Sequence, residues 1–421
     1  MITKPKGTCD IYGKDSRTWL YLNRLIDELC SCYNYEFIRT PIFENSELFH
    51  RSVGESSDIV KKETYDFKDR SDRSLTLRPE GTAGVVRSFI ENKMYGDAIM
   101  PKKLYYNGTM YRYERPQSGR FREFTQFGVE ALGSDDAYID AEVISMGYRF
   151  LEEAGIEDVT VHINSLGDNE SREDYKKALK SYLEPHINEL CPDCQSRFKT
   201  NPLRILDCKF DKDNEILKNV PNILDYLNIE SSKRFKTILS YLDLLDVDYE
   251  VDSNIVRGLD YYNHTVFEFT TQLKDLGNAN TLGAGGRYNN LVNELGGPDI
   301  PAVGMAFGLD RLVTVLNTIN EADSLNSGID VFVMYVNEEE KLKALSLVQD
   351  LRMSGLKVET ENNNRGLKAQ FKEADRFMAK ALIILNSDDL SRGLINVKDN
   401  ITKEETKVDE AEIIDYIVST F

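Results

Sequence analysis

Four arginines stand within eleven residues of this 421-residue chain, at Arg112, Arg115, Arg120 and Arg122. A turn at residues 116–119 separates two strand-like halves, which predicts a hairpin that projects Arg112 and Arg120 toward one volume. Planar guanidinium groups are preferred partners for triphosphate oxygens. The pattern indicates a nucleotide site, although an exposed strand pair with ordinary surface charges would have the same sequence.

Two other segments combine residues that suit a ligand pocket. Residues 256–268 place Arg257, Asp260 and a pair of tyrosines on a predicted strand, and residues 283–288 read Gly-Ala-Gly-Gly-Arg-Tyr. Glycines let a backbone approach a ligand closely. A core strand with an exposed salt bridge would explain the first segment without a ligand, and a glycine bulge would explain the second. The sequence lacks a Gly-x4-Gly-Lys-Ser/Thr loop, a Gly-x-Ser-x-Gly elbow and His-Glu-x-x-His, which removes several large enzyme classes.

One group of residues has the spacing of metal ligands. His186, Cys191, Cys194 and Cys208 form a His-x4-Cys-x2-Cys-x13-Cys pattern that suits tetrahedral zinc. Reduced cytosolic cysteines in a loop-rich stretch also explain the spacing, and six cysteines are too few for a disulfide scaffold. We therefore expect no metal ligands among the protein side chains.

The elements that position these residues predict an α+β fold. Apolar residues at helical spacing indicate a helix at residues 15–33, and strand-like segments joined by polar turns favour a mainly antiparallel sheet flanked by helices. Residues 168–247 are charged and helix-forming, which predicts a helical insertion within a domain at residues 1–325. The expected strands are 35–39, 102–106, 108–115, 121–130, 159–163 and 255–270, and a further helix is expected at 309–319.

The chain continues into a second, smaller domain. Residues 321–328 are polar and end in glycine, as a linker does. A β-α-β-α-β alternation follows, which predicts a separate α/β domain at residues 329–421. Its predicted elements are strands at 330–336, 357–360 and 382–385 with helices at 339–353 and 367–379.

Composition limits the classes of partner. With 71 acidic and 52 basic residues, the chain carries a net charge of -19, which argues against bulk neutralisation of nucleic-acid phosphates and against a DNA-binding protein. The sequence shows no apolar signal segment and no apolar run near the ~18 residues that cross a bilayer. We expect a cytoplasmic protein without a membrane role.

Taken together, the arginine hairpin, the Arg-Gly-Leu-Asp-Tyr-Tyr segment at 257–262 and Gly-Gly-Arg-Tyr at 285–288 resemble the signatures of histidyl-tRNA synthetases. The segments Phe-Ile-Arg-Thr-Pro at 37–41, Leu-Arg-Pro-Glu-Gly-Thr at 77–82 and 301–312 extend the resemblance over essentially the whole chain. The resemblance implies a class II catalytic fold, a C-terminal anticodon-binding domain, and a homodimer. It also implies the reaction: histidine is activated with ATP and Mg2+, and is then transferred to tRNA(His).

The resemblance also implies roles for single residues. Arg112 and Arg257 would bind the ATP α-phosphate from two sides, Glu114 would contact the adenine side, and Arg120 and Arg311 would bind the γ-phosphate. The histidine α-amino group would be received by Glu80, Thr82 and Gln126, its imidazole by Glu130 and Tyr262, with Arg257 near its carboxylate and Tyr261 and Tyr288 lining the pocket. The expected tRNA contacts are Arg365, Lys368, Gln370 and Lys372.

Departures from the family pattern leave an alternative open. Lys6 and Cys9 stand where Arg and Gln are usual, and Asn289-Asn290 replaces Asp-Gly. The regulatory subunit of ATP phosphoribosyltransferase resembles the catalytic domain and binds histidine without aminoacylation, but it generally lacks the anticodon-binding domain. The C-terminal domain and the segment at 257–262 favour the ligase over this subunit. An RNA-binding protein with a degenerate synthetase fold would lose Arg112, Arg257 or Arg311, and all three are present.

Overall fold

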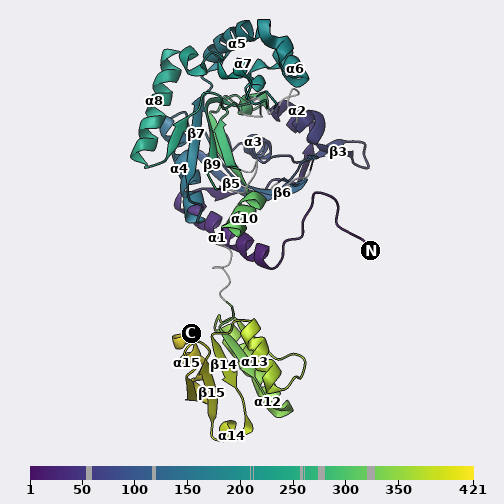
Figure 1. The fold of residues 1–421 in the computed structure, drawn as a ribbon, viewed down its shortest axis with the longest axis vertical. Helices are drawn as coiled ribbons and strands as arrows, with labels where there is room; N and C mark the ends of the chain where they lie inside the picture. The colour runs from purple at the N-terminus through teal and green to yellow at the C-terminus, as the bar shows by residue number, and fades with distance from the viewer. Residues whose placement is uncertain are drawn as a thin grey trace. The chain divides into compact units, whose positions relative to one another are not determined.

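The chain folds into two compact units, Met1–Asp323 and Ser324–Phe421 (Figure 1). The computed structural model describes residues 1–53, 59–115, 120–208, 210–211, 213–256, 259, 261–273, 280–319 and 328–421. Within these ranges, no helix combines the length and the apolar character that a bilayer crossing requires. Each unit has hydrophobic clusters of its own, so each is described separately.

An eight-stranded sheet forms the centre of the first unit, in the order β1-β5-β6-β11-β10-β9-β7-β8. Only the two outermost pairs, β1 with β5 and β7 with β8, are parallel. The remaining pairs are antiparallel, which confirms the predicted sheet type. The strands are β1 Glu36–Phe37, β5 Lys102–Tyr111, β6 Glu123–Leu132, β7 Val159–Ser165, β8 Tyr249–Val251, β9 Asn263–Thr271, β10 Thr281–Arg287 and β11 Ala302–Gly308.

Helices cover this sheet and form the main core with it. Helices α1 (Lys14–Cys32), α4 (Ala137–Glu153) and α10 (Leu309–Thr318) supply buried aliphatic residues. Phe127 and Phe307 from the strands pack edge-to-face against Phe150 of α4. In α1 the three- and four-residue spacing of Leu22, Leu25, Ile26 and Leu29 gives one buried face.

A smaller layer carries the segment that enters the site. A three-stranded sheet has the order β2-β4-β3, and helix α3 (Thr82–Glu91) follows β4. The strands are β2 Phe43–Asn45, β3 Tyr65–Lys68 and β4 Ser74–Leu77, and α2 (Ser46–Val53) packs against α3. Between β4 and α3, the buried Arg78 donates hydrogen bonds to the carbonyl oxygens of Thr40 and Thr109. This anchor fixes the turn that holds Glu80.

Helices gather at one end of the first unit (teal in Figure 1), where a helical insertion was predicted. They are α5 (Asn169–Leu183), α6 (Pro192–Thr200), α7 (Glu215–Lys218) and α8 (Ile229–Leu244), with short 3-10 turns η3 (Glu184–Glu189) and η4 (Pro202–Ile205). The expectation of a loop-rich stretch at 191–202 was wrong. Pro192 occupies the first turn of α6, a position where a missing N–H costs nothing, so it starts this helix.

The second unit is a five-stranded sheet in the order β13-β12-β14-β15-β16. The predicted strands β12 (Val331–Met334), β13 (Val358–Thr360) and β14 (Ala381–Ile384) are parallel, and helices α12 (Glu338–Met353) and α13 (Leu367–Arg376) connect them. Two further strands, β15 (Leu394–Asp399) and β16 (Glu405–Asp409), extend the sheet antiparallel and were not predicted. Helix α15 (Ile413–Thr420) follows.

Candidate active site

Two buried carboxylates lie at the start of α3, linked through one threonine. Glu80 accepts hydrogen bonds from the backbone N–H groups of Thr82 (2.7 Å) and Ala83 (2.8 Å), so its carboxylate caps this helix. The Thr82 hydroxyl donates to Glu130 on β6 at 2.7 Å. Burial raises the pKa of Glu80 above its ordinary value and that of Glu130 to about 8. Within the described chain, neither carboxylate forms an ion pair.

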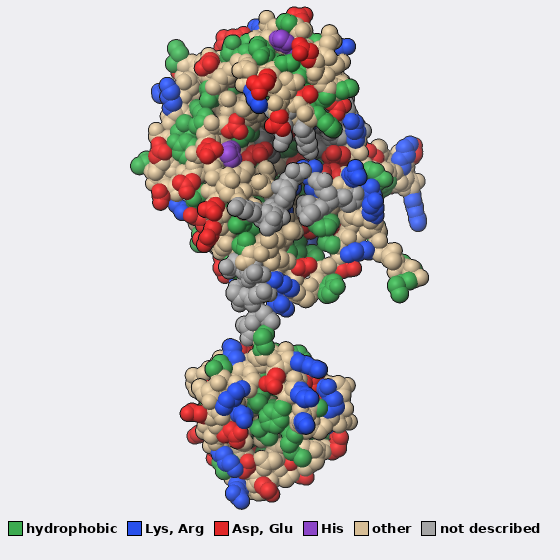
Figure 2. All heavy atoms as spheres, in the orientation of Figure 1, with side chains coloured by type: hydrophobic (Ala, Val, Ile, Leu, Met, Phe, Trp, Pro, Cys, Tyr) green, Lys and Arg blue, Asp and Glu red, His purple; other side chains and the backbone are tan. Residues whose placement is uncertain are grey.

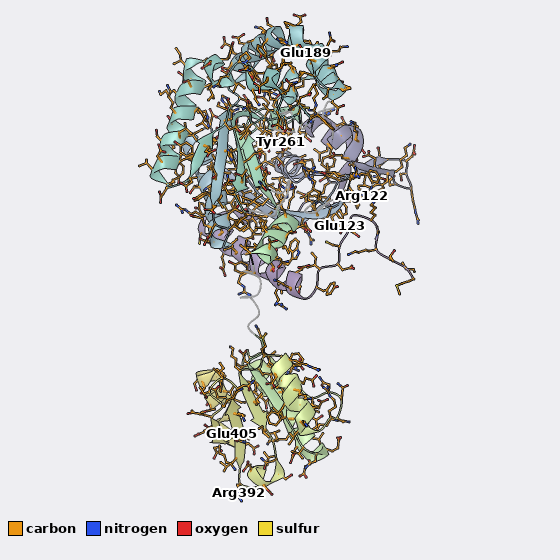
Figure 3. The ribbon with its side chains drawn as sticks, in the orientation of Figure 1. Arg122, Glu123, Glu189, Tyr261, Arg392 and Glu405 are labelled. Atoms are coloured by element: carbon orange, nitrogen blue, oxygen red, sulfur yellow. The ribbon has the colours of Figure 1, made fainter. Side chains whose placement is uncertain are left out.

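Three tyrosines surround this pair of carboxylates. The Tyr288 hydroxyl hydrogen-bonds Glu130, and Tyr261 lies against the rings of Tyr262 and Tyr288 with centroids 4.6 and 5.7 Å apart. Figure 3 shows Tyr261 in the interior of the unit, near β9. All three rings are buried. The structure therefore brings Glu80, Thr82, Glu130 and the three tyrosines together in one buried cluster.

Glycines on neighbouring strands make the room for these side chains. A Cβ on Gly304 would stand 1.8 Å from a carboxylate oxygen of Glu130, and one on Gly286 would stand 2.8 Å from the Tyr262 ring. Any side chain at either position would collide with the pocket wall. The glycine cluster at 283–286 lies on strand β10, whose pairing with β9 is irregular near both ends. Gly286 faces Tyr262, whereas a Cβ on Gly283 or Gly285 would meet the core residues Phe307 and Phe267.

Arginines line a polar cavity of about 510 Å³ on the same side of the sheet. Glu114 lies between Arg112 (3.9 Å) and Arg120 (3.5 Å), and Arg112 is fastened by its Nε to the carbonyl oxygen of Pro79 at 2.8 Å. Arg311, in the first turn of α10, donates to the carbonyl oxygen of Thr281. Burial and the nearby charges of Arg120 and Arg112 lower the pKa of Arg311. Three guanidinium groups around one cavity have the chemistry to bind a polyanion, although five carboxylates line it as well: Glu63, Glu114, Asp207, Glu268 and Asp310.

Gln126 on β6 connects the arginine cavity to the carboxylate pair. It lines the cavity, and it is on the same strand as Glu130, four residues away. Its side-chain Oε1 is buried without a hydrogen-bond partner among the described residues. A buried amide oxygen left without a donor is costly, which indicates that a ligand donates to it.

Two pocket residues were not predicted. Tyr106 of β5 is buried between Gly81 and Gly128, and a Cβ on either glycine would come within 2.3 Å of its ring. Asp310 lines the arginine cavity and accepts the N–H of Thr125 at 2.6 Å, and burial raises its pKa to about 6. Asp310 did have a signal in the sequence, because it precedes Arg311 in the segment at 301–312, whereas Tyr106 stands in none of the quoted motifs.

An ion pair anchors the strand end that carries Tyr288. Arg287 is fully buried and binds Asp140 of α4 with its Nε at 3.0 Å and its Nη2 at 2.5 Å. Arg234 of α8 reaches the same carboxylate at 2.8 Å. Burial alone would raise the pKa of Asp140, but the charges of Arg287 and Arg234 outweigh this effect and lower it. The arginine of the Gly-Gly-Arg-Tyr segment is therefore a structural residue that fixes the tyrosine beside it.

The four predicted RNA contacts of the second unit differ in accessibility. Lys368 and Lys372 are exposed on α13, one helical turn apart, and Figure 2 shows Lys and Arg side chains on this unit's visible face. Arg365 pairs with Glu361 and Glu373. Gln370 is 1 % exposed and hydrogen-bonds Tyr335 and Arg365, so its prediction as an RNA contact was wrong.

Two parts of the predicted site lie outside the described residues, and the group with metal-ligand spacing is described. Arg257 and the turn at 116–119 lie outside the described residues. The four residues with the spacing of metal ligands are only partly brought together, because His186 bonds Glu189 at 3.0 Å on an exposed turn. Cys191, Cys194 and Cys208 do come together, but with Asp211 as the fourth residue.

Comparison with known proteins agrees with this geometry. A family model described as histidyl-tRNA synthetase matches residues 7–312, and one described as an anticodon-binding domain matches residues 330–420. A histidine–tRNA ligase of Bacillus cytotoxicus is 50% identical over 404 residues, covering 96% of each chain, and that of Bacillus subtilis is 49% identical over 410 residues, covering 97% of each. The apo histidyl-tRNA synthetase of S. aureus is 40% identical and covers 99% of this chain and 100% of its own, with a TM-score of 0.84.

The two matched regions correspond to the two units of the fold, and together they define a synthetase with an anticodon-binding domain. The chain belongs to the histidyl-tRNA synthetase family.

Proposed function

We propose that this chain is a histidine–tRNA ligase, which forms histidyl-adenylate from histidine and ATP and transfers histidine to the 3' end of tRNA(His). One observation carries the proposal: the two linked, buried carboxylates Glu80 and Glu130 lie beside an arginine-lined cavity. Buried carboxylates require donors or cations. Histidine supplies an α-ammonium group and an imidazole N–H, while the arginines suit the triphosphate of ATP.

The first step is attack of the histidine carboxylate on the α-phosphorus, with pyrophosphate as the leaving group. Because the substrate is itself the nucleophile, the protein acts by positioning and by charge stabilisation. Arg112 is proposed to bind the α-phosphate, and Arg120 and Arg311 the γ-phosphate. Glu114 lies between Arg112 and Arg120 and is proposed to contact the adenine side. Arg257 is proposed to approach the α-phosphate from the opposite side.

Mg2+ is the ion that we propose to accompany ATP. Carboxylates of Glu268 and Asp207 line the arginine cavity, and Mg2+ is usually held by one or two carboxylates together with substrate phosphates. These residues therefore fit the ion. Bound there, it would neutralise phosphate charge that the arginines leave uncompensated.

Selection of histidine is proposed to rest on the carboxylate pocket. Glu80, Thr82 and Gln126 would receive the α-amino group, and Glu130 and Tyr262 the two imidazole nitrogens, with Tyr261 and Tyr288 as the walls. A wrong side chain would leave these buried polar groups unpaired, at about 1 to 3 kcal/mol for each. The unsatisfied Oε1 of Gln126 supports this assignment.

We further propose that the protein is a cytoplasmic homodimer in which residues 1–325 activate histidine and residues 329–421 bind the anticodon region. Exposed apolar side chains near the sheet edge support the dimer: Phe37, Ile42 and Phe43. On α13, Lys368 and Lys372 are the proposed RNA contacts, with Arg365 beside them. No membrane or DNA partner is proposed.

Histidine-dependent exchange of pyrophosphate into ATP tests the activation step. Exchange with histidine and with no other amino acid is expected, together with a loss of at least about a hundredfold in Arg112→Ala, since removal of one such donor costs 10²–10³ in rate. Arg73→Ala, at an exposed hairpin position, serves as the matched control. Tight histidine binding without exchange in the wild-type chain would contradict the proposal and favour a regulatory histidine-binding protein.

A further inference from the structure

Three thiols and one carboxylate of the helical subdomain converge outside the site described above. Cys191 immediately precedes α6 and Cys194 lies in its first turn, whereas Cys208 and Asp211 follow η4. Their ligand atoms all lie within 4.8 Å of one another. Glu189, just before Cys191, is labelled in this subdomain in Figure 3. The cluster thus joins two segments that are separated by a helix.

Two distances within the cluster match the edges of a zinc tetrahedron. Zinc bonds of about 2.3 Å to sulfur and about 2.1 Å to oxygen place two sulfurs about 3.8 Å apart, and a sulfur and an oxygen about 3.6 Å apart. The Sγ atoms of Cys191 and Cys208 are 3.6 Å apart, and the Sγ of Cys208 is 3.7 Å from Oδ2 of Asp211. A disulfide would need about 2.05 Å, and all three cysteines are free thiols.

Simple packing of small apolar residues does not explain the fourth member. Cys194 and Cys208 are buried among leucines, as structural cysteines often are. Asp211, however, points its carboxylate into the thiols and is held there by the N–H of Cys191 at 2.9 Å. A hydrogen bond to a carboxylate ligand is the support that metal sites use to orient their ligands.

We propose that Cys191, Cys194, Cys208 and Asp211 bind one Zn2+ ion as a closed structural site, with His186 not a ligand. Four protein ligands leave no open position for a reacting water, so the ion would be structural. It would tie the start of α6 to the segment after η4, where Asp207 lines the arginine cavity. The site does not depend on the proposed function, because none of its ligands touches the substrate pockets.

Metal analysis of the full-length chain tests the site. The protein is purified under reducing conditions, loaded with Zn2+ or Co2+ and dialysed, and its metal content and cobalt absorption spectrum are measured. We expect about one ion per chain, with tetrahedral Co2+ bands and thiolate-to-cobalt charge transfer. Cys191→Ser should lose the ion and the charge-transfer band, and Asp211→Asn should bind cobalt at least about tenfold more weakly.

Matched controls separate this site from other ligands on the chain. Cys32→Ser removes an exposed cysteine and His186→Ala removes the exposed imidazole, and both should retain the ion. The proposal is overturned if the reduced wild-type chain retains no metal, if Cys191→Ser retains it fully, or if mass spectrometry finds a Cys191–Cys208 disulfide in its place. Pyrophosphate exchange is measured separately, so a chain that binds zinc without exchange would contradict only the proposed function.

Discussion

At the scale of single residues, Glu130 links substrate recognition to pH. Burial raises its pKa to about 8, whereas an unfolded chain has a pKa near 4.5, so the folded state holds a proton that the unfolded state releases between these values. The contribution of Glu130 to the free energy of unfolding of the ligand-free chain should therefore be highest below pH 4.5. It should fall by up to about 1.4 kcal/mol per pH unit as the pH rises toward 8.

Glu130→Gln is predicted to remove this dependence, because an amide does not titrate. The measurement is thermal unfolding of the variant and the wild type between pH 5 and 8. As the pH rises, the Tm of the wild type should fall relative to the Tm of the variant. Glu91→Gln, at an exposed position of α3, should show no such trend. A wild-type and Glu130→Gln pair with parallel pH profiles would contradict a buried, protonated Glu130. Histidine-dependent exchange should be lost in the variant at every pH.

At the scale of the element, the end of β10 depends on one buried ion pair. Arg287→Met would leave Asp140 buried with only Arg234 as a partner. We predict a loss of about 3 to 5 kcal/mol of stability, because an uncompensated buried charge is costly. The double variant Asp140→Asn, Arg287→Met should recover part of that loss, and chemical denaturation of the three proteins measures it. A double variant less stable than the single one would contradict the assignment.

On α13 the prediction concerns RNA and not stability. Replacing the exposed Lys368 and Lys372 by Glu should lower kcat/KM for aminoacylation about tenfold or more, since each phosphate or base contact is worth about 1 to 3 kcal/mol. Pyrophosphate exchange should be unchanged. Lys403→Glu, on the turn between β15 and β16, is the control. Equal losses in exchange and in charging would show a folding defect in place of lost RNA binding.

The predicted helices, strands and site residues differ in how well the sequence located them. Helical spacing located α1 and α10 to within a residue or two, because each buries one regular apolar face. Motif residues such as Glu80 and Glu130 were placed by resemblance, and only the structure gave the hydrogen bonds through Thr82 that join them. Gln370 was misassigned because burial is not visible in a solvated helix pattern. The edge strand β16 was missed because it is short and polar, with one buried residue. Strand β15 was missed although it lies inside the sheet and buries Ile395 and Val397 in alternation.

At the scale of the whole molecule, exposed apolar residues support the proposed dimer. Phe37 is 57% exposed on the short edge strand β1, and Ile42 and Phe43 are 47% and 53% exposed just beyond Pro41. Large apolar side chains clustered at a sheet edge are typical of an interface that another chain covers. A two-fold dimer would bring the same edge of each copy together.

Phe37→Glu combined with Ile42→Glu is therefore predicted to produce monomers, because two carboxylates would be buried against their own copies at the interface. Sedimentation velocity measures the change, with the wild type expected as a dimer. Ile99→Glu, at another exposed apolar position, should leave the dimer intact. A monomeric wild type, or a dimer that persists in the double variant, would place association elsewhere. Because the phenylalanine and isoleucine lie outside the substrate pocket, any loss of exchange in the monomer would measure how far the paired state supports the site.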